Sequence, residues 1–237
     1  MKNTFFVLLL ITISSSCQTS KIGKDGLSLF DGKSLSGWHV DVPEMDKNKD
    51  AVNPFLVRDE YLVTLGSPGG HLISNVSISN YRINLEYRFA GNPGNCGALV
   101  HVSKPRRLYE MFPQSIEVQL QSTNAGDFWL IGEDLQVPNM VERRGPIEKW
   151  GIDGNKNRRI PNLTGNVEHP PGEWNKMQIE CLGNEIKVWL NGQLVNYGYN
   201  ATASSGSFAL QSEGSEVEFK TVHWRPIKKL SNSHMDF

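Results

Sequence analysis

Hydrophobic and polar residues alternate in short runs from position 27 onward, and Gly, Asn, Pro and Ser separate the runs. The clearest run covers residues 81–89 (YRINLEYRF), in which the odd positions are apolar and the even positions are polar or charged. Because successive side chains of a strand point to opposite faces, this pattern predicts a long strand with one face in the core and one in water. No stretch has the period of a convincing amphipathic helix.

A three-stranded meander is predicted near the end of the chain. Its runs, 174–181, 186–190 and 193–195, are joined by the turn pairs Gly183-Asn184 and Asn191-Gly192. The second pair suits a type I′ turn, since both central residues of that turn need a positive φ, which Asn and Gly tolerate best.

Two more strands are expected at 206–210 and 217–224, before Pro226, which cannot donate to a ladder. Many short alternating strands predict an all-β fold, an antiparallel two-sheet jelly-roll sandwich. Residues 132–172, rich in Pro, Gly and Asn, exceed the usual loop of about 4–6 residues. This stretch is either a functional loop or a surface insertion packed by its own Ile147 and Trp150.

Polar residues gather on one face of three predicted strands. In residues 114–121, alternation places Ile116, Val118 and Leu120 on one face and Glu117, Gln119 and Gln121 on the other. A Gly-rich turn with Asn95 leads into residues 98–102, where His101 lies on the face opposite Val100 and Val102. In the third strand, Gln211 and Glu213 lie on the face opposite Phe208 and Leu210. These side chains either decorate a solvated face or converge on a concave groove.

A groove of amides and carboxylates suits a ligand dense in hydroxyls, and a carbohydrate is the natural candidate. Tryptophan faces can pack against sugar rings, although most Trp in a sandwich belong to the core. The candidates are Trp38, Trp129, Trp150 and Trp174. Alternatively, His101, Glu117 and Glu213 are candidate ligands for a divalent metal cation, which would be the cofactor.

The first residues have the form of an export signal. Residues 1–16 carry a charged start and a short apolar run, and residues 14–17 (SSSC) resemble a bacterial lipobox, so Cys17 is predicted to be lipidated. We therefore expect a lipoprotein signal peptide at 1–16, a lipidated linker at 17–26, the sandwich domain at 27–228 and a tail at 229–237. Contact with a membrane is expected through the lipid anchor alone.

Composition and missing motifs exclude several functions. With 24 Lys and Arg against 25 Asp and Glu, the formal net charge is −1, so the chain has no basic field for nucleic acid. The chain contains no G-x-S-x-G, phosphate-binding glycine loop or dinucleotide fingerprint. Of the two cysteines left after processing, Cys181 is expected to be a buried thiol and Cys96 the more exposed one, and a disulfide between them stays open.

Several segments together resemble a known family. They are residues 29–38 (LFDGKSLSGW), 95–97 (NCG), 112–120 (FPQSIEVQL), 172–175 (GEWN), 191–192 (NG), 206–211 (GSFALQ) and 217–219 (VEF). In order and spacing they are similar to the bacterial 3-keto-disaccharide hydrolase domain. The resemblance implies a concanavalin A-like fold. It also implies an exported lipoprotein of the Bacteroidetes type, held in the periplasm or outer membrane of a Gram-negative bacterium.

The resemblance also implies a substrate, a glycoside whose C3 hydroxyl a partner sugar 3-oxidoreductase has already oxidised to a ketone. The ketone acidifies the C2 hydrogen, so a base can remove it and expel the C1 substituent, after which water adds. Under this hypothesis Glu117 or His101 is the base. A divalent cation, or the amides of Asn95 and Gln119, polarises the ketone, and Glu213 with Gln211 orients the sugar or a metal.

Two departures from the family pattern mark this chain. The family often has Ser at the position of Cys96 and Arg at that of His101, and residues 126–129 (GDFW) replace smaller residues and present Trp129 to a ligand. Two other functions remain open from the sequence. One is a non-catalytic carbohydrate-binding domain, and the other is a conventional glycosidase with Glu117 and Glu213 as its carboxylate pair.

Overall fold

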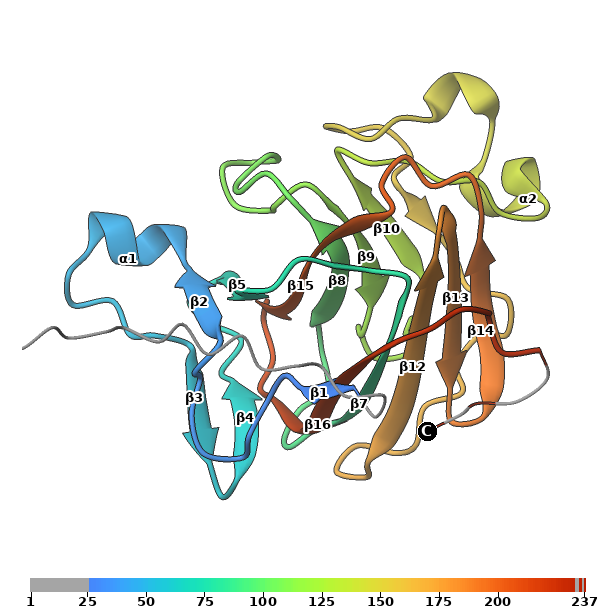
Figure 1. Cartoon of the computed structure of the whole chain (residues 1–237). Coiled ribbons are helices and arrows are strands. Elements are labelled where there is room, and N and C mark those ends of the chain that lie inside the picture. Colours follow the sequence, from blue (N-terminus) through green and yellow to red (C-terminus); the bar gives the residue numbers. More distant parts are fainter. Residues whose placement is uncertain (1–25, 233–234, 236) are drawn as a thin grey trace, which may run out of the picture.

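The protein forms a sandwich of two antiparallel sheets, seen in a computed structural model that describes residues 26–232, 235 and 237 (Figure 1). The predicted signal peptide, Cys17 and most of the linker lie outside the described residues. Within the described chain, the all-β prediction is confirmed.

The first sheet holds eight strands in the described part of the chain, in the order β14-β13-β12-β7-β16-β4-β3, with β1 paired to β16. The strands are β1 (Leu27–Ser28), β3 (Phe55–Arg58), β4 (Tyr61–Thr64), β7 (Tyr81–Phe89), β12 (Asn175–Leu182), β13 (Glu185–Leu190), β14 (Gln193–Gly198) and β16 (Val217–Pro226). The β12-β13-β14 meander confirms the prediction, and its last turn has φ of 49° at Asn191 and 86° at Gly192.

The second sheet also holds eight strands among the described residues, in the order β11-β10-β9-β8-β15-β5-β2, with β6 paired to β15. The strands are β2 (Trp38–Asp41), β5 (Gly70–Ser74), β6 (Ile78–Ser79), β8 (Gly97–Val102), β9 (Ser115–Gln119), β10 (Phe128–Ile131), β11 (Arg159–Ile160) and β15 (Ser205–Ser212). The chain crosses between the sheets repeatedly, for example from β7 to β8, from β11 to β12 and from β15 to β16, so sequence-distant strands become neighbours.

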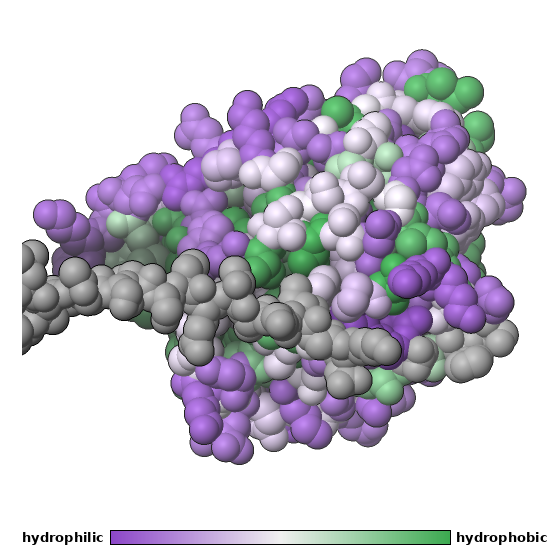
Figure 2. Space-filling model, in the orientation of Figure 1, coloured by the Kyte–Doolittle hydropathy of each residue, from purple (hydrophilic) through white to green (hydrophobic). Residues whose placement is uncertain are grey.

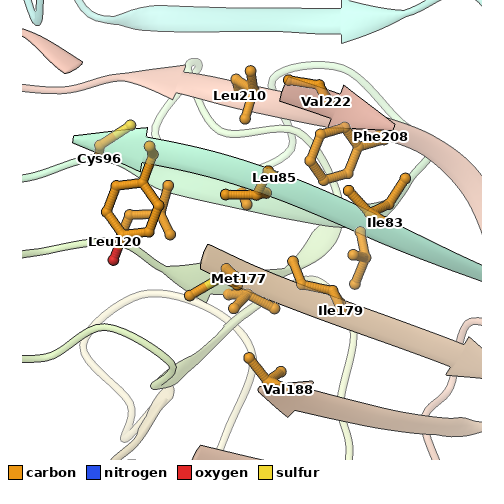
Figure 3. Close-up of a cluster of buried hydrophobic side chains, with 14 of the residues drawn as sticks. Ile83, Leu85, Cys96, Leu120, Met177, Ile179, Val188, Phe208, Leu210 and Val222 are labelled. Carbon is orange, nitrogen blue, oxygen red and sulfur yellow. The ribbon is translucent and has the colours of Figure 1, made fainter. Parts of the chain in front are cut away.

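The main core lies between the two sheets (Figure 3). Ile83 and Leu85 of β7 face inward with Met177 of β12, and Phe208 and Leu210 of β15 meet them from the second sheet. All five of these side chains are fully buried. Burial of a large apolar side chain contributes about 1.5–3 kcal/mol, so this layer is a main source of the sandwich's stability.

The outer face of β7 is not exposed to solvent along its whole length, contrary to the sequence prediction. Arg82 is buried and pairs with Glu180 of β12, the two atoms Nη2 and Oε1 being 2.5 Å apart. Ser231 of the C-terminal tail covers the pair, since its hydroxyl and backbone N–H both bond to the Glu180 carboxylate. Alternation correctly separated the two faces of β7, but it could not show that the tail packs on the outer one.

The helices of the described residues are short. They are α1 (Pro43–Lys47), α2 (Met140–Arg144) and the 3₁₀ helix η1 (Ile147–Lys149). Over the part of the chain that the structure covers, no helix has the length and apolar character needed to cross a membrane. The face seen in Figure 2 is largely hydrophilic, with small hydrophobic areas between the polar residues. The predicted long loop, 132–172, contains α2, η1 and β11.

Candidate functional site

The polar face of β9 lies beside two other strands that carry the predicted site residues. Glu117 is registered between Leu99 of β8 and Trp129 of β10, and Gln119 stands opposite Gly97 of β8. A Cβ placed on Gly97 would lie 2.4 Å from Glu117 Oε1 and 3.0 Å from Gln211 Oε1. The glycine therefore leaves the space above β8 that the Glu117 carboxyl and the Gln211 amide occupy.

A pocket of about 390 Å³ opens over this face. Its lining includes six of the residues that the sequence singled out, namely Asn95, Glu117, Gln119, Gln121, Trp129 and Glu213. Four further lining residues were missed, namely Tyr109, Phe112, Ile131 and Arg158. The structure thus brings most of the predicted site residues together and adds an aromatic and cationic rim.

The Glu117 carboxyl has the most perturbed surroundings in this pocket. The residue is 5% exposed, and Oε1 has no hydrogen-bond partner among the described residues. Burial, followed by the negative charge of Glu213, raises the pKa of Glu117 to about 8, and the positive charge of Arg158 opposes the shift. A carboxyl with a pKa near neutral pH is suited to take up and return a proton.

Glu213 follows β15 and shares the pocket. Burial raises its pKa above the ordinary value for a glutamic acid, and the Gln211 side chain opposes that shift. The negative charge of Glu213 in turn raises the pKa of Glu117, so the two carboxyls of the pocket influence each other's surroundings.

Amide groups supply the neutral donors and acceptors of the pocket. Gln119 Oε1 accepts the backbone N–H groups of Leu120 and Gln121, each at 2.9 Å, which leaves its amide nitrogen to donate to a ligand. The Gln121 oxygen accepts from Asn124 at 3.0 Å. Asn95 Oδ1 is buried and has no partner within the described chain. Buried polar atoms without partners mark places where a ligand can bond.

Arg158 forms the cationic part of the rim. Its guanidinium lies 5.3 Å from the ring centroid of Trp129 and 5.8 Å from that of Tyr109. It donates to the carbonyls of Leu130 at 3.2 Å and Gly154 at 3.3 Å, and the Tyr109 hydroxyl donates to the same Gly154 carbonyl at 3.1 Å. In the sequence, the only feature that marked Arg158 as a candidate site residue was the length of the 132–172 loop in which it lies.

The prediction that His101 shares the face of Glu117 is wrong. His101 has φ of 57°, and the β8–β15 register shifts at this point, so the strand bulges and turns the imidazole toward the core. The ring packs on Tyr81 of the first sheet, with 5.6 Å between centroids and 3.4 Å from the hydroxyl to Nδ1. His101 is fully buried, and burial lowers its pKa to about 4. We therefore assign it no catalytic role.

The predicted metal ligands are not brought together either, because His101 lies outside the pocket. Over the described residues, no group of three or more His, Cys, Asp or Glu side chains is placed to hold an ion. The residues present do not fit the predicted metal centre, and we derive no step through a metal.

The other aromatic and cysteine candidates lie elsewhere. Trp38 packs on Phe208 in the core, Trp174 packs edge-on against Tyr61 of the first sheet, and Trp150 lies under Arg144 beside α2. Cys96 and Cys181 are both buried free thiols, so the expectation of an exposed Cys96 is wrong. Of the predicted tryptophans, Trp129 is the one that lines the pocket.

His71 of β5 lies next to Gln211 of β15 in the second sheet, and the sequence pattern did not predict it as a site residue. Its side chain is fully buried and packs edge-on against Phe112 with 5.8 Å between ring centroids. Neither ring nitrogen has a partner among the described residues, and burial lowers the pKa of His71 to about 3. The imidazole is therefore neutral under the 103–114 loop.

Comparison with known proteins identifies the family. The sequence profile of the 3-keto-alpha-glucoside-1,2-lyase-like domain matches residues 26–225. The chain belongs to this family. The match spans the whole sandwich, including the strands that carry Glu117, Gln119 and Gln211. No curated protein matches the chain.

Solved structures share the architecture of this family member. Two proteins of Parabacteroides distasonis ATCC 8503, both provisionally described as glycosyl hydrolases, superpose on it. The first has a TM-score of 0.59 at 22% identity, covering 84% of this chain and 93% of the other. The second has a TM-score of 0.51 at 19% identity, covering 80% and 99%.

The carbohydrate-binding module CBM66 of Bacillus subtilis superposes with a TM-score of 0.53 at 12% identity, covering 80% of this chain and 95% of the module. At these identities the likenesses establish the fold alone. They confirm the predicted jelly-roll sandwich of concanavalin A type.

Proposed function

We propose that this chain cleaves glycosides whose sugar carries a ketone at C3, by elimination of the C1 substituent followed by addition of water. The observation that carries the proposal is the buried Glu117 carboxyl, with a pKa near 8 and an unpartnered oxygen, in a pocket lined by amides and Arg158. Membership of the 3-keto-alpha-glucoside-1,2-lyase-like family supports it.

In the first step the Glu117 carboxylate removes the proton from C2 of the sugar. The electron pair of the C2–H bond moves onto the C3 ketone and forms an enolate. Negative charge then develops on the C3 oxygen, and the pocket must stabilise it. Among the described lining residues, Arg158 is the only cation, and the Asn95 and Gln119 side chains offer amide donors. We assign the charge stabilisation to these three groups.

In the second step the enolate collapses, the C3 ketone re-forms, a C1–C2 double bond appears and the C1–O bond breaks. Glu213 lines the same pocket, and we assign it as the acid that protonates the departing oxygen. Water then adds, its oxygen to C1 and its proton to Glu213, while Glu117 returns its proton to C2. The sum of the steps is hydrolysis, and both carboxyls end in their starting states.

This mechanism differs from that of a conventional glycosidase, which needs no ketone. The experiment is to incubate the purified domain with 3-keto-glucosides of both anomers and with their unoxidised parents, and to follow release of the aglycone. Release from the keto form alone supports the proposal. Release from the parents as well would overturn it in favour of a carboxylate-pair glycosidase, and binding without release would favour a carbohydrate-binding domain.

A substitution then assigns the base. Glu117→Gln keeps the shape of the side chain and removes the base, so we expect kcat/KM on a 3-keto-glucoside to fall by about 10²–10⁴-fold. Full turnover by this variant would remove Glu117 from the mechanism. The same assay with a chelator tests the predicted divalent cation, for which the described residues offer no ligand group. Turnover that survives chelation agrees with the structure, and a loss that added cation reverses would support the cation instead.

We also propose that the chain is exported and lipid-anchored through Cys17, and that a sugar 3-oxidoreductase supplies its substrate. The residues that support the anchor are the short apolar run and residues 14–17. Incorporation of labelled fatty acid by the full chain, lost in Cys17→Ser, tests the anchor. Labelling that persists in Cys17→Ser would contradict it.

A further inference from the structure

A second groove adjoins the Glu117 pocket and differs from it in charge. It measures about 400 Å³, and five of its nine lining residues are Arg or Lys, while none is Asp or Glu. The five cations are Arg143, Arg144, Lys156, Arg158 and Arg159. We call this feature the basic groove. It stands out on a chain whose formal net charge is −1.

The basic groove and the pocket share two lining residues, Trp129 and Arg158. A substrate too long for the pocket would pass these two side chains to reach the groove. Under the proposed function, the pocket holds the oxidised sugar ring. The basic groove is then the place for the rest of the substrate.

Three of the five cations form no direct ion pair with a described residue, while Asp127 and Glu142 act on the charge of Arg143 from a longer range and Arg158 acts on Glu117. Arg144 pairs with Asp134 and Arg159 with Asp127, at 2.8 and 2.7 Å. Arg143, Lys156 and Arg158 form no ion pair with any residue that the structure describes. Charges of one sign along a groove raise the local concentration of oppositely charged ligands. The basic groove therefore favours an anion.

Hydrogen bonds hold two guanidinium groups of the groove, those of Arg143 and Arg158, in place. Arg143 donates to the Pro161 carbonyl and, through Nη2, to the Asn196 oxygen at 2.7 Å. Its Nη1 atom is buried and lacks a partner among the described residues. Arg158 is held by two backbone carbonyls and two aromatic rings. Fixed guanidinium groups lose little freedom when they bind, and their planar fork matches a carboxylate or a sulfate.

We propose that the basic groove binds an anionic group, a carboxylate or a sulfate ester, on the part of the substrate that leaves from C1. The preferred substrates are then 3-keto-glycosides of a sugar acid or of a sulfated sugar. The inference rests on the proposed function and narrows it, because a neutral second sugar would gain little from the charges of Arg143 and Lys156, which the proposed mechanism leaves unused.

The experiment compares three 3-keto-disaccharides that share the oxidised glucosyl unit and the linkage. They differ at C6 of the second sugar, which is a hydroxymethyl, a carboxylate or a sulfate ester. We expect kcat/KM to be at least tenfold higher for an anionic substrate than for the neutral one, and the advantage to shrink as NaCl rises. The carboxylate and sulfate arms identify which anion is preferred.

Substitutions in the basic groove test which cations cause the preference for an anionic substrate. Arg143→Gln is expected to lower the anionic-to-neutral ratio of kcat/KM about tenfold, and the exposed Lys156→Gln a few-fold. Lys33→Gln, which removes a lysine from the 31–36 loop far from the groove in sequence, is the matched control and should leave the ratio unchanged. A thermal unfolding curve for each variant separates loss of fold from loss of preference.

The outcomes separate the two proposals. Equal turnover of all three substrates, or a ratio that neither groove variant changes, overturns the inference and leaves the proposed function standing. If no 3-keto substrate is turned over, the proposed function fails. Calorimetric binding of the unoxidised disaccharides then decides the inference, where tighter binding of an anionic one supports it and equal or absent binding overturns it.

Discussion

Glu117 should destabilise the folded protein at alkaline pH, and Glu117→Gln should relieve that cost. The pKa of this carboxyl is about 8 in the fold against a reference value of 4.5. A carboxyl whose folded pKa is raised holds its proton more tightly in the fold, so the stability present below pH 4.5 is lost as the pH rises to about 8.

The magnitude follows from the size of the shift. Each pKa unit corresponds to about 1.4 kcal/mol, so a shift of this size sets a ceiling of about 5 kcal/mol above pH 8. Glu117 is 5% exposed, which leaves little screening by solvent, but entry of water into the pocket would relax part of the cost. We expect Glu117→Gln to stabilise the fold by roughly 2–5 kcal/mol at pH 9 and by less than about 1 kcal/mol at pH 5.

The assay is thermal unfolding of the wild type and the variant at pH 5 and pH 9. For a chain of this size, the difference at pH 9 corresponds to a rise in Tm on the order of 5–20 °C. Glu44→Gln, at an exposed position in α1, controls for the loss of one acidic group. If the Tm values of wild type and Glu117→Gln differ equally at both pH values, the burial argument for Glu117 is refuted.

Four further predictions concern this pocket and the strands beneath it. The kcat/KM for a 3-keto-glucoside should rise with pH with a midpoint near 8, where half of the Glu117 carboxyls are ionised. Arg158→Gln should move that midpoint upward in the pH–rate profile, because Arg158 lowers the pKa of Glu117; an unmoved midpoint would contradict the coupling. Gly97→Ala should cut kcat/KM at least about 100-fold with a loss of about 1–3 kcal/mol in denaturant unfolding, because its Cβ would meet the Glu117 carboxyl. Gly91→Ala, in open space, is its control and should keep wild-type kinetics. Asparagine tolerates the positive φ at position 101, so His101→Asn should keep kcat within about threefold. A larger loss of kcat in folded protein would show that His101 takes part in the reaction.

The C-terminal tail on the outer face of β7 shows what an alternating pattern can predict and what it cannot. The alternation in residues 81–89 correctly placed Ile83 and Leu85 in the core, since the side-chain period of a strand is a local property of the backbone. It placed Arg82 in water, where the structure buries it under Ser231. The pairing of residues about 150 positions apart depends on packing, which no local period encodes.

By itself, the sequence determined the sandwich, the turn at Asn191-Gly192, and the placement of Glu117 and Gln119 on one face of β9. These follow from residue periodicity and turn chemistry, and the resemblance to the family added the candidate substrate. Tertiary structure alone decided the rest. The bulge at His101 reversed the direction of one side chain, because a single backbone angle changes which face a residue occupies. Arg158 and the basic groove exist only where a folded loop meets Trp129 at the sheet, a juxtaposition that arises from long-range packing rather than from neighbouring residues.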